Sequence, residues 1–278
     1  MTQARAFFSG STVHYLFAVH LPRSPRYRSL DMWRGVACLM VVVFHSVQFC
    51  PPRADAGDWP NVFISLAWRG IFGVPIFFVI SGYCISATAD SSRHKSTAIR
   101  DYFLRRFRRI FPPYWGCLVL TVGFTLVLEL FGWRHLVDRG FPVPFTLPIP
   151  YVSQFGLLEW IGNVTLTETW LPGLRTMGRV LILGQAWTLC YEEQFYAVTG
   201  ILLMIAPRHF FRSMAMVSLA VIATCNTSLA FWGVFWDGRW LLFAAGVGVY
   251  YAINYAGSAG KCLLAAVLSL GLALDIYR

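Results

Sequence analysis

Charged residues are scarce in this sequence of 278 residues: they make up 13% of it, about half the share usual in a soluble domain. Hydrophobic residues make up 57% and aromatic residues 17%, which favours lipid over water as the surroundings of the chain. The net charge of +10 could suit nucleic acid. The basic residues, however, lie between apolar segments and not in one patch, which argues against a nucleic-acid-binding protein.

Motifs of bridged or metal-binding cysteines are also missing. None of the seven cysteines forms a CxxC pair or a Cys/His metal spacing, so we expect neither disulfides nor a metal site. A cleavable signal peptide is absent as well, because polar residues interrupt the stretch 7–21 and no cleavage site follows. We interpret residues 1–27 as a cytosolic N-terminal extension and residues 28–278 as one transmembrane domain.

Seven apolar segments approach the length of a membrane-spanning helix, about 20 residues. They are 32–50, 63–86, 111–131, 186–206, 213–233, 239–256 and 261–276. The third is predicted to begin at Pro112-Pro113, and the fourth to end at Pro207, because proline interrupts helices. The pattern predicts an all-α fold, a polytopic transmembrane helix bundle.

The distribution of arginine and lysine orients this bundle. Basic residues gather before the first span, between the second and third, and after the fourth, which places these segments and the N-terminus on the cytosolic side. The long segment 132–185 is rich in proline and then too polar for a lipid-facing span, so we expect short helices there, packed on the outer face or dipping into a cavity. Because the sequence ends directly after an odd span, we expect it to hold less than the complete bundle.

The first span carries Arg34 and, eleven residues later, His45. That spacing is within about 20° of three full turns, so both side chains share one helix face, separated by about 16 Å along the axis. An ionisable side chain at this depth usually faces the bundle interior or a wet cavity. Histidine is the common general base near neutral pH. The alternative is a structural histidine that bonds to a neighbouring helix.

Three further motifs carry polar groups at span ends. The second span contains Ser81-Gly82-Tyr83, which is typical of close helix packing. Four arginines, 105, 106, 108 and 109, precede the third span; Arg106 and Arg109 share a helix face and suit either a phosphate group or anionic lipid headgroups.

The fourth span begins with Glu192-Glu193, two adjacent carboxylates that must point in different directions. One of them could approach His45, orient its ring and stabilise its charged form. The alternative is a polar span boundary within an aromatic belt.

Together these motifs resemble the acyltransferase-3 family of membrane-bound O-acyltransferases. The resemblance covers about residues 28–200, more loosely 240–250, and is carried by the motifs at 30–45, 73–83, 106–114 and 187–196. It implies His45 and Glu192 as catalytic residues. It also implies Arg34, Arg106 and Arg109, and with them Ser81 and Tyr83, as binding residues for substrate or acyl-CoA. The family usually has about ten spans, more than the seven visible in this sequence.

The resemblance further implies transfer of an acyl group, often acetyl, from cytosolic acyl-CoA to a hydroxyl of a carbohydrate or glycolipid in the bacterial inner membrane. Acyl-CoA is then a cosubstrate, and no permanently bound cofactor or metal is expected. His45 would act either as general base or as the carrier of the acyl group. The alternatives are a transporter or flippase with His45, Arg34 and Glu192 as a polar relay, and a scaffold without chemistry. Against a transporter, we find no internal inverted repeat.

Overall fold

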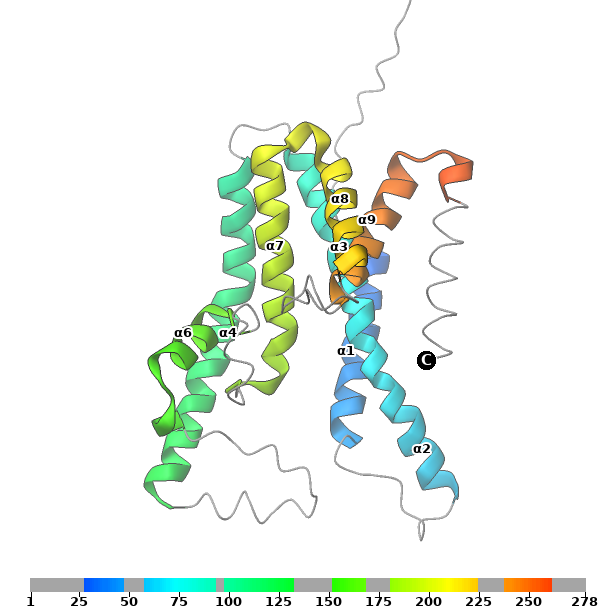
Figure 1. Cartoon of the computed structure of the whole chain (residues 1–278). Coiled ribbons are helices and arrows are strands. Elements are labelled where there is room, and N and C mark those ends of the chain that lie inside the picture. The colour runs from blue at the N-terminus through cyan, green and yellow to red at the C-terminus, as the bar shows by residue number, and fades with distance from the viewer. Residues whose placement is uncertain are drawn as a thin grey trace, which may run out of the picture.

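The computed structural model describes residues 28–47, 58–93, 98–132, 152–168, 181–224 and 238–261. Within these ranges the regular structure is helical and no strand occurs, as predicted (Figure 1). The elements are α1 (Arg28–Val47), α2 (Asp58–Trp68), η1 (Arg69–Phe72), α3 (Gly73–Ser92), α4 (Ala98–Leu130), η2 (Val152–Gln154), α6 (Leu157–Thr165), η4 (Gly184–Ala186), α7 (Trp187–Ile205), η5 (Pro207–His209), α8 (Phe210–Thr224) and α9 (Arg239–Asn254).

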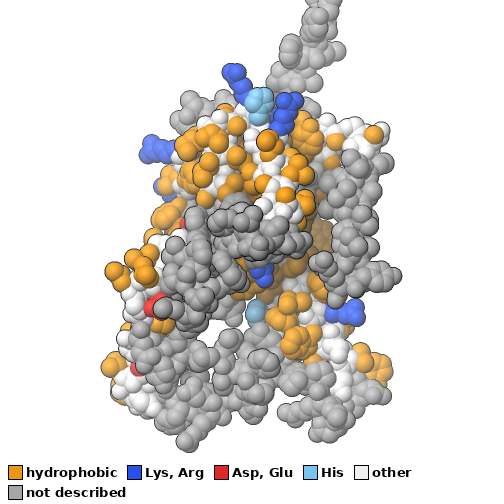
Figure 2. Space-filling view, in the orientation of Figure 1, with side chains coloured by type: hydrophobic (Ala, Val, Ile, Leu, Met, Phe, Trp, Pro, Cys, Tyr) orange, Lys and Arg blue, Asp and Glu red, His pale blue; other side chains and the backbone are white. Residues whose placement is uncertain are grey.

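Three helical stretches are long and apolar enough to cross a membrane: Ser29–Val47, Trp59–Ser92 and Ile99–Leu130. They correspond to the first three predicted spans and support a membrane protein. In the upper part of Figure 2, hydrophobic side chains are prominent among the described residues, and basic ones lie at the upper end. The fourth and sixth predicted spans coincide with α7 and α9, and α8 covers the first part of the fifth. The rest of the fifth and nearly all of the seventh lie outside the described residues, so the count of seven spans stays a prediction.

The third span does not begin at its two prolines. Helix α4 runs without interruption from Ala98 to Leu130, with Pro112 and Pro113 inside it, so that prediction is wrong. Proline removes one backbone donor and crowds the preceding turn. Here the helix is fixed just beyond the pair, because Tyr114 donates a hydrogen bond to the Asn163 carbonyl and Trp115 donates one to the Val164 carbonyl.

The segment after the third span forms short helices, as expected. Its described part includes η2 and α6, and both lie against α4. Asn163 is fully buried and connects α6 to the residues before α7, since its side-chain oxygen accepts a hydrogen bond from the Ile182 amide at 2.9 Å. The short helix η4 ends the segment, whose residues 133–151 and 169–180 lie outside the described residues.

Helix α3 is central to the described bundle. It packs against α1, α4, α7 and α9, and α4 and α7 lie side by side next to it (Figure 1). Helices α3 and α9 approach each other closely, because each places a glycine in their contact. A Cβ atom on Gly82 would lie 2.1 Å from the Phe243 carbonyl oxygen, and one on Gly246 would lie 2.0 Å from that of Val79. Glycine at both positions therefore permits this crossing.

Candidate functional site

Helix α1 carries the predicted catalytic histidine and one predicted binding arginine. Arg34 is half-buried and pairs with Asp31 at 3.4 Å, one turn earlier. His45 lies near the other end of the helix, with its ring centroid 5.2 Å from that of Phe44. Phe44 in turn contacts Trp68 edge to face at 5.6 Å, which holds this end of α1 against α2. Both site residues thus belong to one continuous helix, about 16 Å apart along its axis.

The structure brings the three predicted binding arginines together around α3. Leu30, one turn before Arg34, packs beside Tyr83 of α3. Arg106 of α4 bonds to Thr88 of the same helix, and Arg109 follows Arg106 by one turn. Arg34 and the arginine pair of α4, 72 or more residues apart in the sequence, are therefore carried to one part of α3.

Arg106 is the most firmly held of the α4 arginines. It is half-buried, while Arg105, Arg108 and Arg109 are exposed. One terminal nitrogen donates a hydrogen bond to Thr88 Oγ1 of α3 at 3.1 Å. The guanidinium carbon lies 4.9 Å from the Tyr196 ring centroid and 5.7 Å from that of Tyr102. Arg106 is therefore fixed by α3, α4 and α7 at once.

The Glu192 carboxylate is held within the same region. Ser81 on α3 donates a hydrogen bond to its Oε1 at 2.6 Å, and the Tyr196 hydroxyl donates to the same atom. Ser81 and Glu192, both predicted site residues, are thereby joined. Glu193 is the next residue on α7, about 100° further around the helix. The prediction that the two adjacent carboxylates point in different directions follows from this spacing and stays a prediction.

Along the axis of the bundle, Glu192 lies closer to the arginines than to His45. Helices α1 and α3 are antiparallel, since Gly70 approaches Met40 and Gly73 approaches Ala37. Leu30, one turn before Arg34, packs beside Tyr83 of α3, close to Ser81, whereas His45 lies about 16 Å beyond Arg34 along α1. In this structure the carboxylate bonds to Ser81 and Tyr196; a role in orienting His45 stays a prediction.

Tyr83 lies on a different side of α3 from Ser81. Its ring is buried and contacts Tyr250 of α9 edge to face at 5.3 Å. The two residues are about 200° apart around the helix. The structure places the Tyr83 ring in the α3–α9 interface; a role in binding the acyl donor stays a prediction.

Sequence reasoning missed the residues that hold the predicted ones in place. Thr88 and Tyr196 were not singled out, although each stands at a helical repeat from a predicted residue. Thr88 follows Ser81 by two turns, and Tyr196 follows Glu192 by one. This helical spacing could have pointed to both residues from the sequence alone. The contact of Tyr196 with Arg106 could not have been predicted in this way, because it depends on how α4 packs beside α7.

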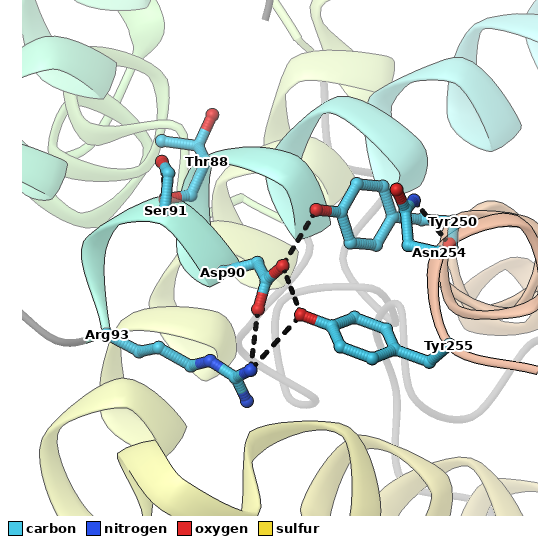
Figure 3. A network of polar contacts seen from close by, with 7 residues as sticks. All are labelled: Thr88, Asp90, Ser91, Arg93, Tyr250, Asn254 and Tyr255. Atoms are coloured by element: carbon cyan, nitrogen blue, oxygen red, sulfur yellow. Dashed lines mark hydrogen bonds and ion pairs between the residues drawn. The ribbon is translucent and has the colours of Figure 1, made fainter. Parts of the chain in front are cut away.

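A second polar network, also missed, joins the ends of α3 and α9 (Figure 3). Asp90 accepts hydrogen bonds from the hydroxyls of Tyr250 at 2.9 Å and Tyr255 at 2.6 Å, and pairs with Arg93 at 2.9 Å. Arg93 also donates to the Tyr255 hydroxyl at 3.2 Å. The network adds directional bonds to an interface that is otherwise apolar.

Loss of one hydroxyl from this network should be measurable. We expect Tyr250→Phe to lower the free energy of unfolding by about 1–2 kcal/mol, because a hydrogen bond to a charged carboxylate is lost. Tyr251→Phe, the same change one residue later on an exposed ring, is the matched control and should change it by less than about 0.5 kcal/mol. Thermal and denaturant unfolding in detergent measure both; equal effects would contradict the assignment.

Comparison with known proteins gives the class. The family described as Acyltransferase domain matches residues 27–277, and the chain belongs to this acyltransferase-3 family. The match confirms the resemblance read from the motifs. No solved structure matches the chain.

Several similar proteins carry specific names. The chain is 25% identical over 181 residues to the peptidoglycan O-acetyltransferase OatA of Listeria monocytogenes, covering 64% of this chain and 24% of the relative. It is 28% identical over 223 residues to the O-acetyl transferase of Shigella phage Sf6, covering 79% and 57%. It is 26% identical over 200 residues to the putative peptidoglycan O-acetyltransferase YrhL of Bacillus subtilis, covering 70% and 27%. The chain thus spans between about a quarter and somewhat over half of these relatives.

Proposed function

We propose that this protein is a membrane O-acyltransferase that moves an acyl group, most simply acetyl, from cytosolic acyl-CoA to a hydroxyl of a carbohydrate or glycolipid. The family and the names of the relatives support O-acetyl transfer. The observation that carries the donor is that α1, with Arg34, and α4, with Arg106 and Arg109, meet the same part of α3, where Leu30 packs beside Tyr83 and Arg106 bonds to Thr88. Arginine is the preferred protein partner for phosphate, and CoA is the acyl donor with a polyanionic end.

The spacing between the arginines and the histidine fits such a donor. The pantetheine arm of CoA has twelve bonds between its first phosphate-bound oxygen and the sulfur, about as many as four extended residues, or about 14 Å. His45 lies about 16 Å along α1 from Arg34. A donor held by its phosphates near Arg34 would therefore bring its thioester to the level of His45.

The chemistry at His45 has two forms. As a general base, its imidazole takes the proton of the acceptor hydroxyl while that oxygen attacks the thioester carbonyl and CoA leaves as the thiol. As a nucleophile, the imidazole nitrogen takes the acyl group first and CoA leaves; the acceptor hydroxyl then receives the acyl group from the imidazole. Glu192 would influence this chemistry only through the groups that it holds, because it bonds to Ser81 and Tyr196 and lies closer to the arginines than to His45.

The proposed acceptor rests only on the names of the relatives. Two of the three compared proteins are named for peptidoglycan, so peptidoglycan fragments are the first acceptor to test. The basic helix ends would face the cytosol and the acceptor would be reached from the opposite side, in a bacterial inner membrane.

Acetyl-CoA binding tests the donor without an acceptor. Purified protein in lipid nanodiscs should gain thermal stability on adding acetyl-CoA, because a ligand that binds only the folded state stabilises it. Arg34→Gln should weaken acetyl-CoA binding about tenfold or more, since a charge-assisted phosphate contact is lost. Arg208→Gln, which removes an exposed arginine of η5, is the matched control. A wild-type protein that neither gains stability nor binds acetyl-CoA would favour the transporter alternative and overturn the proposal.

A further inference from the structure

We propose that Tyr196 is a positioning residue that fixes the Arg106 guanidinium for the phosphates of the acyl donor. The inference rests on the proposed function. Tyr196 is 3% exposed and lies on α7 between two charged groups. Its hydroxyl donates to Glu192, while its ring faces Arg106 at 4.9 Å. Neither role follows from the sequence motifs.

The contact with the ring holds Arg106 without using its hydrogen-bond donors. A cation over an aromatic ring is attracted through the face of the guanidinium, so the N–H groups in its plane stay available. Thr88 accepts from one terminal nitrogen. Within the described residues the buried Nε–H of Arg106 has no hydrogen-bond partner. Arg106 is therefore held in orientation, with one of its buried donors still unpaired.

The ring also separates Arg106 from the nearby carboxylate. Glu192 accepts from Ser81 and from the Tyr196 hydroxyl, and no ion pair between Glu192 and Arg106 occurs in the described ranges. A direct ion pair would use the arginine donors and reduce its attraction for phosphate. With Tyr196 between them, the carboxylate fixes the ring, and the ring fixes the arginine.

The backbone of Tyr196 is fixed from the α4 side as well. The hydroxyl of Tyr102, a fully buried residue one turn before Arg106, donates to the Tyr196 carbonyl at 3.3 Å. The Tyr102 ring lies beneath the same guanidinium at 5.7 Å. Two tyrosines from two helices thus support one arginine, with Tyr196 the closer.

The first experiment compares three variants in nanodiscs, with peptidoglycan fragments as acceptor. Tyr196→Leu removes the ring and should raise the KM and the dissociation constant for acetyl-CoA about tenfold, with kcat within about twofold. Tyr196→Phe keeps the ring and should raise both constants by less than about threefold. Phe195→Leu is the matched control, because it removes a neighbouring buried ring that packs on Trp240 and Phe243. It should lower thermal stability and leave the KM unchanged.

A double-mutant cycle separates positioning from general packing. If Tyr196 acts through Arg106, Tyr196→Leu should have no further effect on the acetyl-CoA dissociation constant in an Arg106→Gln background. An additive tenfold loss in that background, or an equal rise in KM for Phe195→Leu, would overturn the role of Tyr196. Failure of the wild-type protein to bind acetyl-CoA would instead overturn the proposed function itself.

Discussion

Replacement of His45 by alanine is expected to lower kcat for acyl transfer by about 10²–10⁴-fold, the usual contribution of a positioned general acid–base group. The KM and dissociation constant for acetyl-CoA should change little, because the proposed phosphate site begins at Arg34, about 16 Å away along α1. His209→Ala, an exposed histidine of η5, is the matched control and should retain full activity. The measurement is acetyl-CoA-dependent acetylation of peptidoglycan fragments at equal protein amounts.

The His45 variant also separates the two chemical forms of the mechanism. Protein incubated with labelled acetyl-CoA and no acceptor, then quenched rapidly, should carry label if the imidazole accepts the acetyl group. In that case His45→Ala should carry none. A wild-type protein without label, together with the loss of kcat in the variant, identifies a general base. Undiminished transfer by well-folded His45→Ala would exclude both forms.

The largest effect on stability is expected at the α3–α9 crossing. Gly246→Ala should lower the free energy of unfolding by about 3 kcal/mol, because the added Cβ would lie 2.0 Å from the Val79 carbonyl oxygen and the helices must move apart. Gly123→Ala is the matched control in α4, where nothing lies within 4 Å of the added atom. It should raise stability by up to about 1 kcal/mol through helix propensity. Thermal unfolding in detergent measures both variants.

The comparison is informative because the two variants are expected to change the free energy of unfolding in opposite directions. Both variants add one methyl group to a helical glycine, so propensity alone predicts the same gain for each. A stabilising Gly246→Ala would mean that α3 and α9 do not approach as closely as the structure has them. A loss of stability in both variants would mean that the bundle does not tolerate an added methyl group even at an open helical glycine.

Most of the helices could be predicted from the sequence, because the length of an apolar segment and the positions of its prolines are features of the local sequence. The predicted span 186–206 differs from α7, Trp187–Ile205, by one residue at each end. The prediction failed at Pro112-Pro113, where α4 continues through both prolines. The reason is tertiary: hydrogen bonds from Tyr114 and Trp115 to α6 fix the helix beyond them.

The candidate site, like the helices, could be predicted from the sequence only in part. The sequence by itself determined that Arg34 and His45 share a helix and that Glu192 and Glu193 diverge, because helical periodicity fixes directions within one segment. Only the tertiary structure decided that Arg34 and the arginines of α4 are carried to one part of α3, and that Tyr83 packs against Tyr250 of α9. Contacts between segments depend on how close two helices approach, and here that distance is set by facing glycines and by the tyrosines around Arg106.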